Sequence, residues 1–172
     1  MRPVPSLFKA GARRLDPGTR PAIFQRIVYP GRKPGMPTVS VTRRVHFNAA
    51  HRLYNPAYPD DWNARVYGVC ANPNYHGHNY ELDITVTGAV DPETGYVLDI
   101  NVLKRLAEEK LLAHLDHRNL NLDVPHFREV IPTAEHIVTY CWGILRAALP
   151  PALALRLRLW ETPRNYVDFE GF

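Results

Sequence analysis

Two histidines, His76 and His78, are the residues in this sequence best placed to do chemistry. They stand at the start of an alternating pattern that indicates a β-strand, and side chains on a strand return to the same face every second residue. Both imidazoles are therefore expected to point the same way, with Gly77 adding no bulk between them. Such a pair supplies half of a zinc site, although two solvent-facing histidines would give the same pattern.

A third histidine, His51, ends the preceding alternating segment. A catalytic zinc ion takes three protein ligands and keeps a fourth position open. If the two strands form a hairpin, the end of the first lies beside the start of the second, which brings His51 near His76. The sequence therefore predicts a zinc site formed by His51, His76 and His78. Ordinary surface or capping roles are expected for the others considered: His46, His114, His126 and His136.

Cys70 lies shortly before the histidine pair, and several roles are open to it. It either completes a closed structural site with the three histidines, or is a buried apolar thiol, or acts as an acid–base thiolate beside the metal. The last role is chemically reasonable because a nearby positive charge lowers the pKa of a thiol. Cys141 falls on the apolar side of a predicted helix and is expected in the core.

Two further groups could take part in acid–base chemistry or binding. Asp116 and His117 form a carboxylate–imidazole pair able to relay a proton, although adjacent residues need not face each other. Glu161 ends a strand on the same parity as its leucines, and a carboxylate buried without a partner is costly. An amino-pyrimidinone ring, with two adjacent N–H donors, would be a suitable partner. Alternatively, the strand has already ended and Glu161 is solvated.

The elements that must position these residues follow the order ββααββ. This order predicts an α+β domain in which a four-stranded antiparallel sheet carries two helices on one face. The other face is expected to need a cover, such as a partner subunit. Asn101 and Thr133 are the expected N-caps of the two helices. The predicted segments are strand 39–48, loop 54–69, strand 80–87, helix 101–114, a helix from 133 to Pro150, strand 153–160 and strand 165–170.

Length and charge point to one domain preceded by an arm. The chain has 172 residues, enough for a single core. Residues 1–37 hold seven of the sixteen prolines and are expected to form a basic arm, with the domain spanning 38–172. Residues 1–44 contain ten Lys or Arg and one acidic residue, so their formal net charge is +9. Residues 45–172 contain eleven Lys or Arg and sixteen acidic residues, so their formal net charge is −5. The arm is expected to be a solvated extension, with nucleic acid, a membrane surface or an acidic neighbour as alternative contacts.

Two cysteines are too few for a disulfide framework, so a reducing, cytoplasmic setting is expected. No apolar run reaches the roughly 18 residues that a membrane span requires.

Four motifs resemble the 6-pyruvoyltetrahydropterin synthase family of lyases, which includes the 6-carboxytetrahydropterin synthases of queuosine biosynthesis. The resemblance covers residues 41–171. It implies a tunnelling fold (T-fold), in which three four-stranded sheets form a trimeric barrel and two trimers stack as a homohexamer. The motifs are Arg44–Leu53, Gly68–Tyr80, Leu115–Leu120 and Trp160–Thr162.

The resemblance also implies roles for individual residues. The zinc ligands fall on His51, His76 and His78, the catalytic cysteine on Cys70, and an Asp–His relay, acting across a subunit interface, on Asp116 and His117. The pterin-anchoring carboxylate falls on Glu161, and further pocket residues fall on Thr133 and Glu135. Ala134 departs from the family's Thr-Thr-Glu.

The implied reaction is zinc-dependent conversion of 7,8-dihydroneopterin triphosphate to 6-pyruvoyltetrahydropterin with elimination of triphosphate. Formation of 6-carboxytetrahydropterin with release of acetaldehyde is the alternative. A more distant alternative is a non-catalytic zinc module in which Cys70 is the fourth ligand and the basic arm binds nucleic acid.

Overall fold

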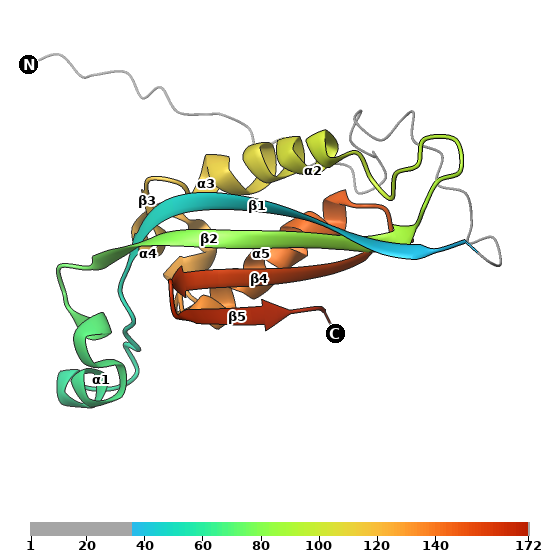
Figure 1. Ribbon diagram of the computed structural model, residues 1–172. Helices are drawn as coiled ribbons and strands as arrows, with labels where there is room; N and C mark the ends of the chain where they lie inside the picture. The colour runs from blue at the N-terminus through green and yellow to red at the C-terminus, as the bar shows by residue number, and fades with distance from the viewer. Residues whose placement is uncertain (1–35, 172) are drawn as a thin grey trace, which may run out of the picture.

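A long β-hairpin runs the full length of the sheet (Figure 1). The computed structural model describes residues 36–171, so the expected arm lies outside the described residues except for positions 36 and 37. Strand β1 (Thr38–His51) pairs antiparallel with β2 (His76–Ala89) along its whole length. The register ends with His51 directly opposite His76. The predicted hairpin is confirmed, and β2 begins at His76 rather than at Tyr80.

The sheet contains a strand that the sequence did not indicate. Strands β4 (Ala154–Thr162) and β5 (Asn165–Phe169) continue it antiparallel beyond β2, as expected. On the other side the two-residue β3 (Arg118–Asn119) pairs parallel with the end of β1, so the order is β3-β1-β2-β4-β5. The expected four-stranded antiparallel sheet is therefore a mixed five-stranded sheet. Two residues carry no readable alternation, which is why β3 escaped prediction.

The predicted helices cover one face of the sheet (Figure 1). The first consists of α2 (Ile100–Ala107), the π-helical turn η3 (Glu108–Leu112) and α3 (Ala113–Leu115). Its N-cap is Asp99, whose carboxylate accepts from the Asn101 N–H at 2.8 Å, so the expected cap at Asn101 is wrong by two residues. The second helix is α5 (Ala134–Ala148), and Thr133 caps it as predicted.

Short helices occupy the segments that were expected to be irregular. The expected loop 54–69 contains α1 (Asp60–Tyr67) and the start of the 3-10 turn η2 (Gly68–Ala71), and α1 stands away from the sheet (Figure 1). The buried Asn63 side chain organises this segment through bonds to the backbone of Asn55, Tyr58 and Pro59. Between α3 and α5 lie α4 (Leu120–Asp123) and η4 (Pro125–Arg128).

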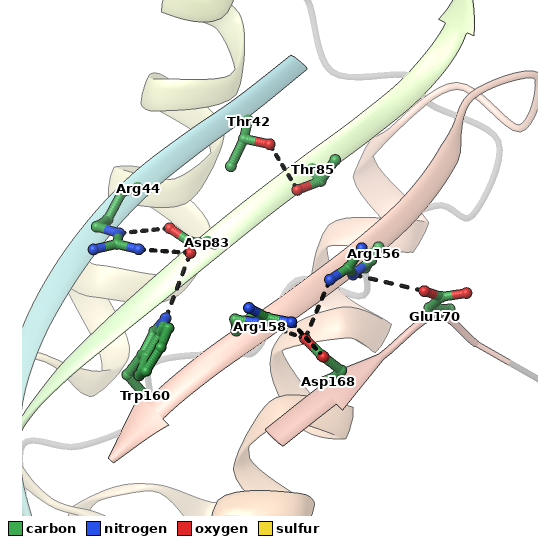
Figure 2. Close-up of polar contacts among 9 residues, drawn as sticks. All are labelled: Thr42, Arg44, Asp83, Thr85, Arg156, Arg158, Trp160, Asp168 and Glu170. Carbon is green, nitrogen blue, oxygen red and sulfur yellow. Dashed lines mark hydrogen bonds and ion pairs between the residues drawn. The ribbon is translucent and has the colours of Figure 1, made fainter. Parts of the chain in front are cut away.

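The two faces of the sheet differ in chemistry. The inner face and the helices bury an apolar core that includes Phe47, Leu82 and the fully buried Cys141. The outer face carries polar pairs, among them Thr42 with Thr85 at 2.8 Å (Figure 2). This face is therefore mainly polar, but it also carries Trp160 and the 45% exposed Tyr166, whose ring centroids lie 4.5 Å apart. A partner subunit that covers this face stays a prediction. Among residues 36–171, no helix combines the length and apolar character needed to cross a membrane.

Candidate metal centre

Three histidine side chains converge where β1 ends and β2 begins. The hairpin register places His51 opposite His76, and strand alternation puts His78 on the same face. One ring nitrogen from each of the three lies within 4.8 Å of the others. His51 is fully buried, and the other two are half-buried. The structure thus brings together the three residues that the sequence singled out as metal ligands.

The orientation of His51 is fixed by a backbone carbonyl. Its Nδ1 lies 2.8 Å from the carbonyl oxygen of Pro132, just before α5. Because a carbonyl only accepts, Nδ1 carries the hydrogen, and the lone pair of Nε2 faces the other histidines. Burial lowers the pKa of His51 to about 4, and burial likewise lowers the pKa of His76. Both imidazoles are therefore neutral near pH 7, the form that binds a metal.

The donor atoms fit a divalent cation. The Nε2 atoms of His51 and His76 are 3.1 Å apart, and two lone pairs at that distance repel unless a proton or cation lies between them. Tetrahedral zinc, with Zn–N bonds of about 2.0–2.1 Å, holds its ligand nitrogens about 3.3 Å apart. The buried His78 Nε2 has no hydrogen-bond partner among the described residues. An orphaned buried nitrogen facing two other imidazoles is what a metal ligand looks like without its ion.

Glu161 lies beside this cluster. One of its carboxylate oxygens is 3.8 Å from His51 Nε2 and 3.9 Å from His78 Nε2. The strand β4 continues to Thr162, so Glu161 is inside the strand and shares the inner face with the leucines before it. Its side chain is 25 % exposed, which rules out the alternative of a fully solvated residue beyond the strand end. The carboxylate therefore borders the open side of the three histidines.

Cys70 lies in η2, half-buried and not bonded to another cysteine. Within the described chain, the group of side chains able to hold a metal consists of the three histidines and does not include this thiol. A closed site with Cys70 as fourth ligand is therefore not what the geometry presents. Burial, together with the negative charge of Glu161, raises the pKa of the Cys70 thiol. The expected thiolate is thus a thiol at neutral pH when no cation is bound.

The Asp116–His117 pair is built on the backbone of one residue, Asn48. The Asn48 N–H donates to the Asp116 carboxylate at 2.8 Å, and the His117 N–H donates to the Asn48 carbonyl at 2.7 Å. His117 has a positive φ of 56°, uncommon for a residue with a side chain. Its Nδ1 lies 3.0 Å from the Asp116 carboxylate. The bond from Asn48, with help from His117, lowers the pKa of Asp116.

This pair does not meet Cys70 within the chain. No hydrogen bond or ion pair joins the two in the described residues, and the His117 side chain is 77 % exposed. His117 instead lines an open groove of about 590 Å³ on the sheet, together with Asn48 and His78. The carboxylate–imidazole contact between Asp116 and His117 that the sequence indicated is present, but the His117 side chain faces outward.

Two contacts at the centre were missed by sequence reasoning. The Pro132 carbonyl cannot be read from a side chain, because any residue at that position provides one. Tyr80 is fully buried, and its hydroxyl lies 3.4 Å from His51 Nδ1. Its position two residues after His78, on the same face, was the available signal. The predicted Thr133 caps α5 at 3.4 Å, and Glu135 is exposed in the first turn of that helix.

Comparisons with known proteins agree with this arrangement. The sequence model of the family "6-pyruvoyl tetrahydropterin synthase" matches residues 40–171. A curated 6-pyruvoyl tetrahydrobiopterin synthase from Pongo abelii is 43% identical over 131 residues, which is 76% of this chain and 90% of the relative. A 6-carboxy-5,6,7,8-tetrahydropterin synthase from Rickettsia typhi is 29% identical over 152 residues, covering 76% and 99%.

The fold agrees as well. A solved structure of 6-pyruvoyl tetrahydropterin synthase from Caenorhabditis elegans superimposes with a TM-score of 0.76 at 36% identity, covering 80% of this chain and 98% of that one. The matched region includes all but the first two residues of the hairpin, the three histidines and the strand that carries Glu161. Family model, relatives and fold thus point the same way, and the chain belongs to the 6-pyruvoyl tetrahydropterin synthase family.

Proposed function

We propose that this chain is a zinc-dependent lyase that converts 7,8-dihydroneopterin triphosphate to 6-pyruvoyltetrahydropterin with elimination of triphosphate. The observation that carries the proposal is the convergence of three imidazole nitrogens within 4.8 Å in a member of this family. Relatives at 43% and 36% identity are named as pyruvoyl-forming synthases. The carboxy-forming relative is less similar, at 29%.

His51, His76 and His78 would hold the zinc ion through ring nitrogens. The neutral rings of His51 and His76 leave a nitrogen lone pair free on each, and the His51–Pro132 bond directs the lone pair of His51 inward. When bound, zinc would supply Lewis-acid polarisation of the substrate's side-chain hydroxyls, which acidifies the neighbouring C–H groups. Hydroxyl binding requires an open coordination position, and the absence of Cys70 from the cluster supports one.

Cys70 is the proposed proton-transfer residue, acting on the C–H groups of the substrate side chain. Its raised pKa means that the thiol must lose its proton to a partner before it can act as a base. We assign that partner to the Asp116–His117 pair of a neighbouring subunit. The exposure of His117 and its groove on the sheet support action across an interface. The same assignment calls for a homo-oligomer, proposed to be the family's hexamer of stacked trimeric barrels.

The pterin ring is proposed to bind between Glu161 and the N-terminus of α5. The Glu161 carboxylate is an acceptor for the two adjacent N–H groups of the pyrimidinone edge. Thr133 and Glu135 are proposed to flank the ring, because they follow Pro132, whose carbonyl lies 2.8 Å from His51 Nδ1. Ala134 offers no hydroxyl, so this pocket has one hydrogen-bonding group fewer than the family's Thr-Thr-Glu. Fixing ring and side chain together contributes to rate by orientation.

The deciding experiment is product identification. Zinc-loaded protein is incubated with 7,8-dihydroneopterin triphosphate and the products are separated by mass. We expect 6-pyruvoyltetrahydropterin and triphosphate. Formation of 6-carboxytetrahydropterin with acetaldehyde would replace the proposed activity with that of the related synthases. No conversion by a zinc-loaded oligomer would refute catalysis.

A variant of Cys70 separates its two possible roles. Cys70→Ala is expected to retain one zinc ion per chain and to lose turnover, because the thiol transfers protons and does not bind the metal. Loss of zinc from this variant would instead identify Cys70 as a ligand and support the non-catalytic zinc module.

A further inference from the structure

Arg52, the residue after the metal ligand His51, connects the end of β1 to the turn that carries Cys70. Its guanidinium Nε donates to the carbonyl oxygen of Ala71 at 2.8 Å. The next residue, Leu53, donates its backbone N–H to the carbonyl oxygen of Cys70 at 2.9 Å. The two residues that follow β1, Arg52 and Leu53, therefore hydrogen-bond to two consecutive backbone carbonyls of η2.

Arg52 is itself held on both sides. Its backbone N–H donates to the Asn121 side chain at 2.8 Å, and the same Asn121 amide donates back to the Arg52 carbonyl at 3.0 Å. Its guanidinium lies over the ring of Tyr54, 4.0 Å from the centroid. Tyr54 in turn donates to Asp60 in α1 at 2.8 Å. The planar guanidinium is thus fixed by a ring and a carbonyl, a geometry that lysine does not reproduce.

Within the part of the chain that the structure describes, two hydrogen bonds tie η2, the turn that carries Cys70, to residues more than ten positions away, and these are the bonds from Arg52 and Leu53. The thiol sits in a four-residue 3-10 turn that follows the projecting α1. The neighbouring Val69 side chain is 87% exposed and contributes little packing. The position of the thiol relative to the histidines therefore depends on the bonds to Ala71 and Cys70 carbonyls.

We propose that Arg52 is a positioning residue that holds Cys70 in place beside the three-histidine centre. Arg52 acts through the backbone of η2 and touches neither metal nor substrate. The kinetic consequence rests on the proposed function, whereas the placement of the thiol can be tested without it.

The test compares Arg52→Met with Arg146→Met. Arg146 is a matched control because its guanidinium also donates to backbone carbonyls, those of Leu149, Pro150 and Leu153, at the far end of α5. Both variants are assayed for zinc bound per chain, for the rate of alkylation by iodoacetamide, and for kcat and KM. Alkylation reports on Cys70 alone, since Cys141 is fully buried and the chain has two cysteines.

We expect Arg52→Met to keep its zinc and to be alkylated about tenfold faster. Loss of one charge-assisted hydrogen bond raises the equilibrium constant for local opening of the Cys70 turn by about that factor. The kcat of this variant should fall about 10–100-fold, as for other residues that orient a site from behind. KM should change by less than about threefold, because substrate contacts are intact. Arg146→Met should match the wild type in all three measurements.

Two results would overturn the proposal. One is an alkylation rate for Arg52→Met equal to that of Arg146→Met. The other is loss of zinc, which would show that Arg52 supports His51 and not Cys70. If Arg52→Met does not fold, Arg52→Lys retains a donor and should shift alkylation in the same direction by a smaller factor; an unchanged rate again rejects the role. A wild-type protein without turnover would reject the proposed function, while zinc content and alkylation would still decide the placement.

Discussion

Replacing His51 with alanine should abolish the stabilisation that zinc gives to this fold. A ligand that binds the folded state at 1,000 times its Kd adds about 4 kcal/mol to the free energy of unfolding. For a chain of 172 residues, at about 2–4 °C per kcal/mol, this corresponds to a rise in Tm of about 8–16 °C. His51 is the fully buried residue of the three, and the two half-buried histidines that remain provide too few ligands to hold zinc tightly enough for this shift.

The variant also carries a cost that does not depend on metal. Without the imidazole, the carbonyl of Pro132 loses its 2.8 Å hydrogen bond in a buried position. An unsatisfied buried acceptor costs about 1–3 kcal/mol, so zinc-free His51→Ala should melt several degrees below the zinc-free wild type. Thermal unfolding of both proteins is therefore followed after chelation and again with added zinc.

His136→Ala is the matched control for this experiment. The Nδ1 of His136 lies 2.7 Å from the carbonyl oxygen of Ile131, and His51 makes the same kind of bond with the carbonyl of Pro132. Unlike His51, His136 is exposed and lies outside the three-histidine cluster. It should keep the full zinc-dependent rise in Tm. The reasoning is refuted if the wild type shows no such rise, or if His51→Ala shows one of the same size.

Two further predictions concern the parts of the fold around the centre. The Arg44 guanidinium donates two hydrogen bonds to Asp83 and lowers the pKa of that carboxyl. The pair therefore stabilises the fold fully above the unfolded-state pKa of about 3.9. This stabilisation is lost as the pH falls through the lower pKa of the folded state. Asp83→Asn should therefore lower the free energy of unfolding in urea by about 1 kcal/mol at pH 7 but not near pH 2, and an equal deficit at both would contradict this account (Figure 2). Asn63→Ala removes a 1% exposed side chain that accepts from the Asn55 N–H at 2.7 Å. Hydrogen exchange of the Asn55 amide should become about 30-fold faster, equivalent to about 2 kcal/mol, and unchanged protection would show that α1 is held by other contacts.

The sequence by itself singled out the three histidines of the candidate metal centre and the strands that carry them. Strand alternation places His76 and His78 on one face whatever the rest of the chain does, because the period of two is a property of the extended backbone. The same parity put Glu161 among the leucines of its strand, and the helix cap at Thr133 follows from local hydrogen bonding. Strand alternation and helix capping are readable because they depend on residues a few positions apart, whereas His51 was placed by the hairpin expected between its strand and that of His76.

Tertiary structure decided the contacts that join distant segments. The Pro132 carbonyl that orients His51 and the Asn48 backbone that holds Asp116 are main-chain groups, and every residue possesses them. Only the folded chain determines which carbonyl meets which ring. The helix α1 was likewise missed, because it is organised around the single buried polar side chain of Asn63 and shows little apolar periodicity. The sequence thus specified the reactive groups, and long-range packing set their orientation.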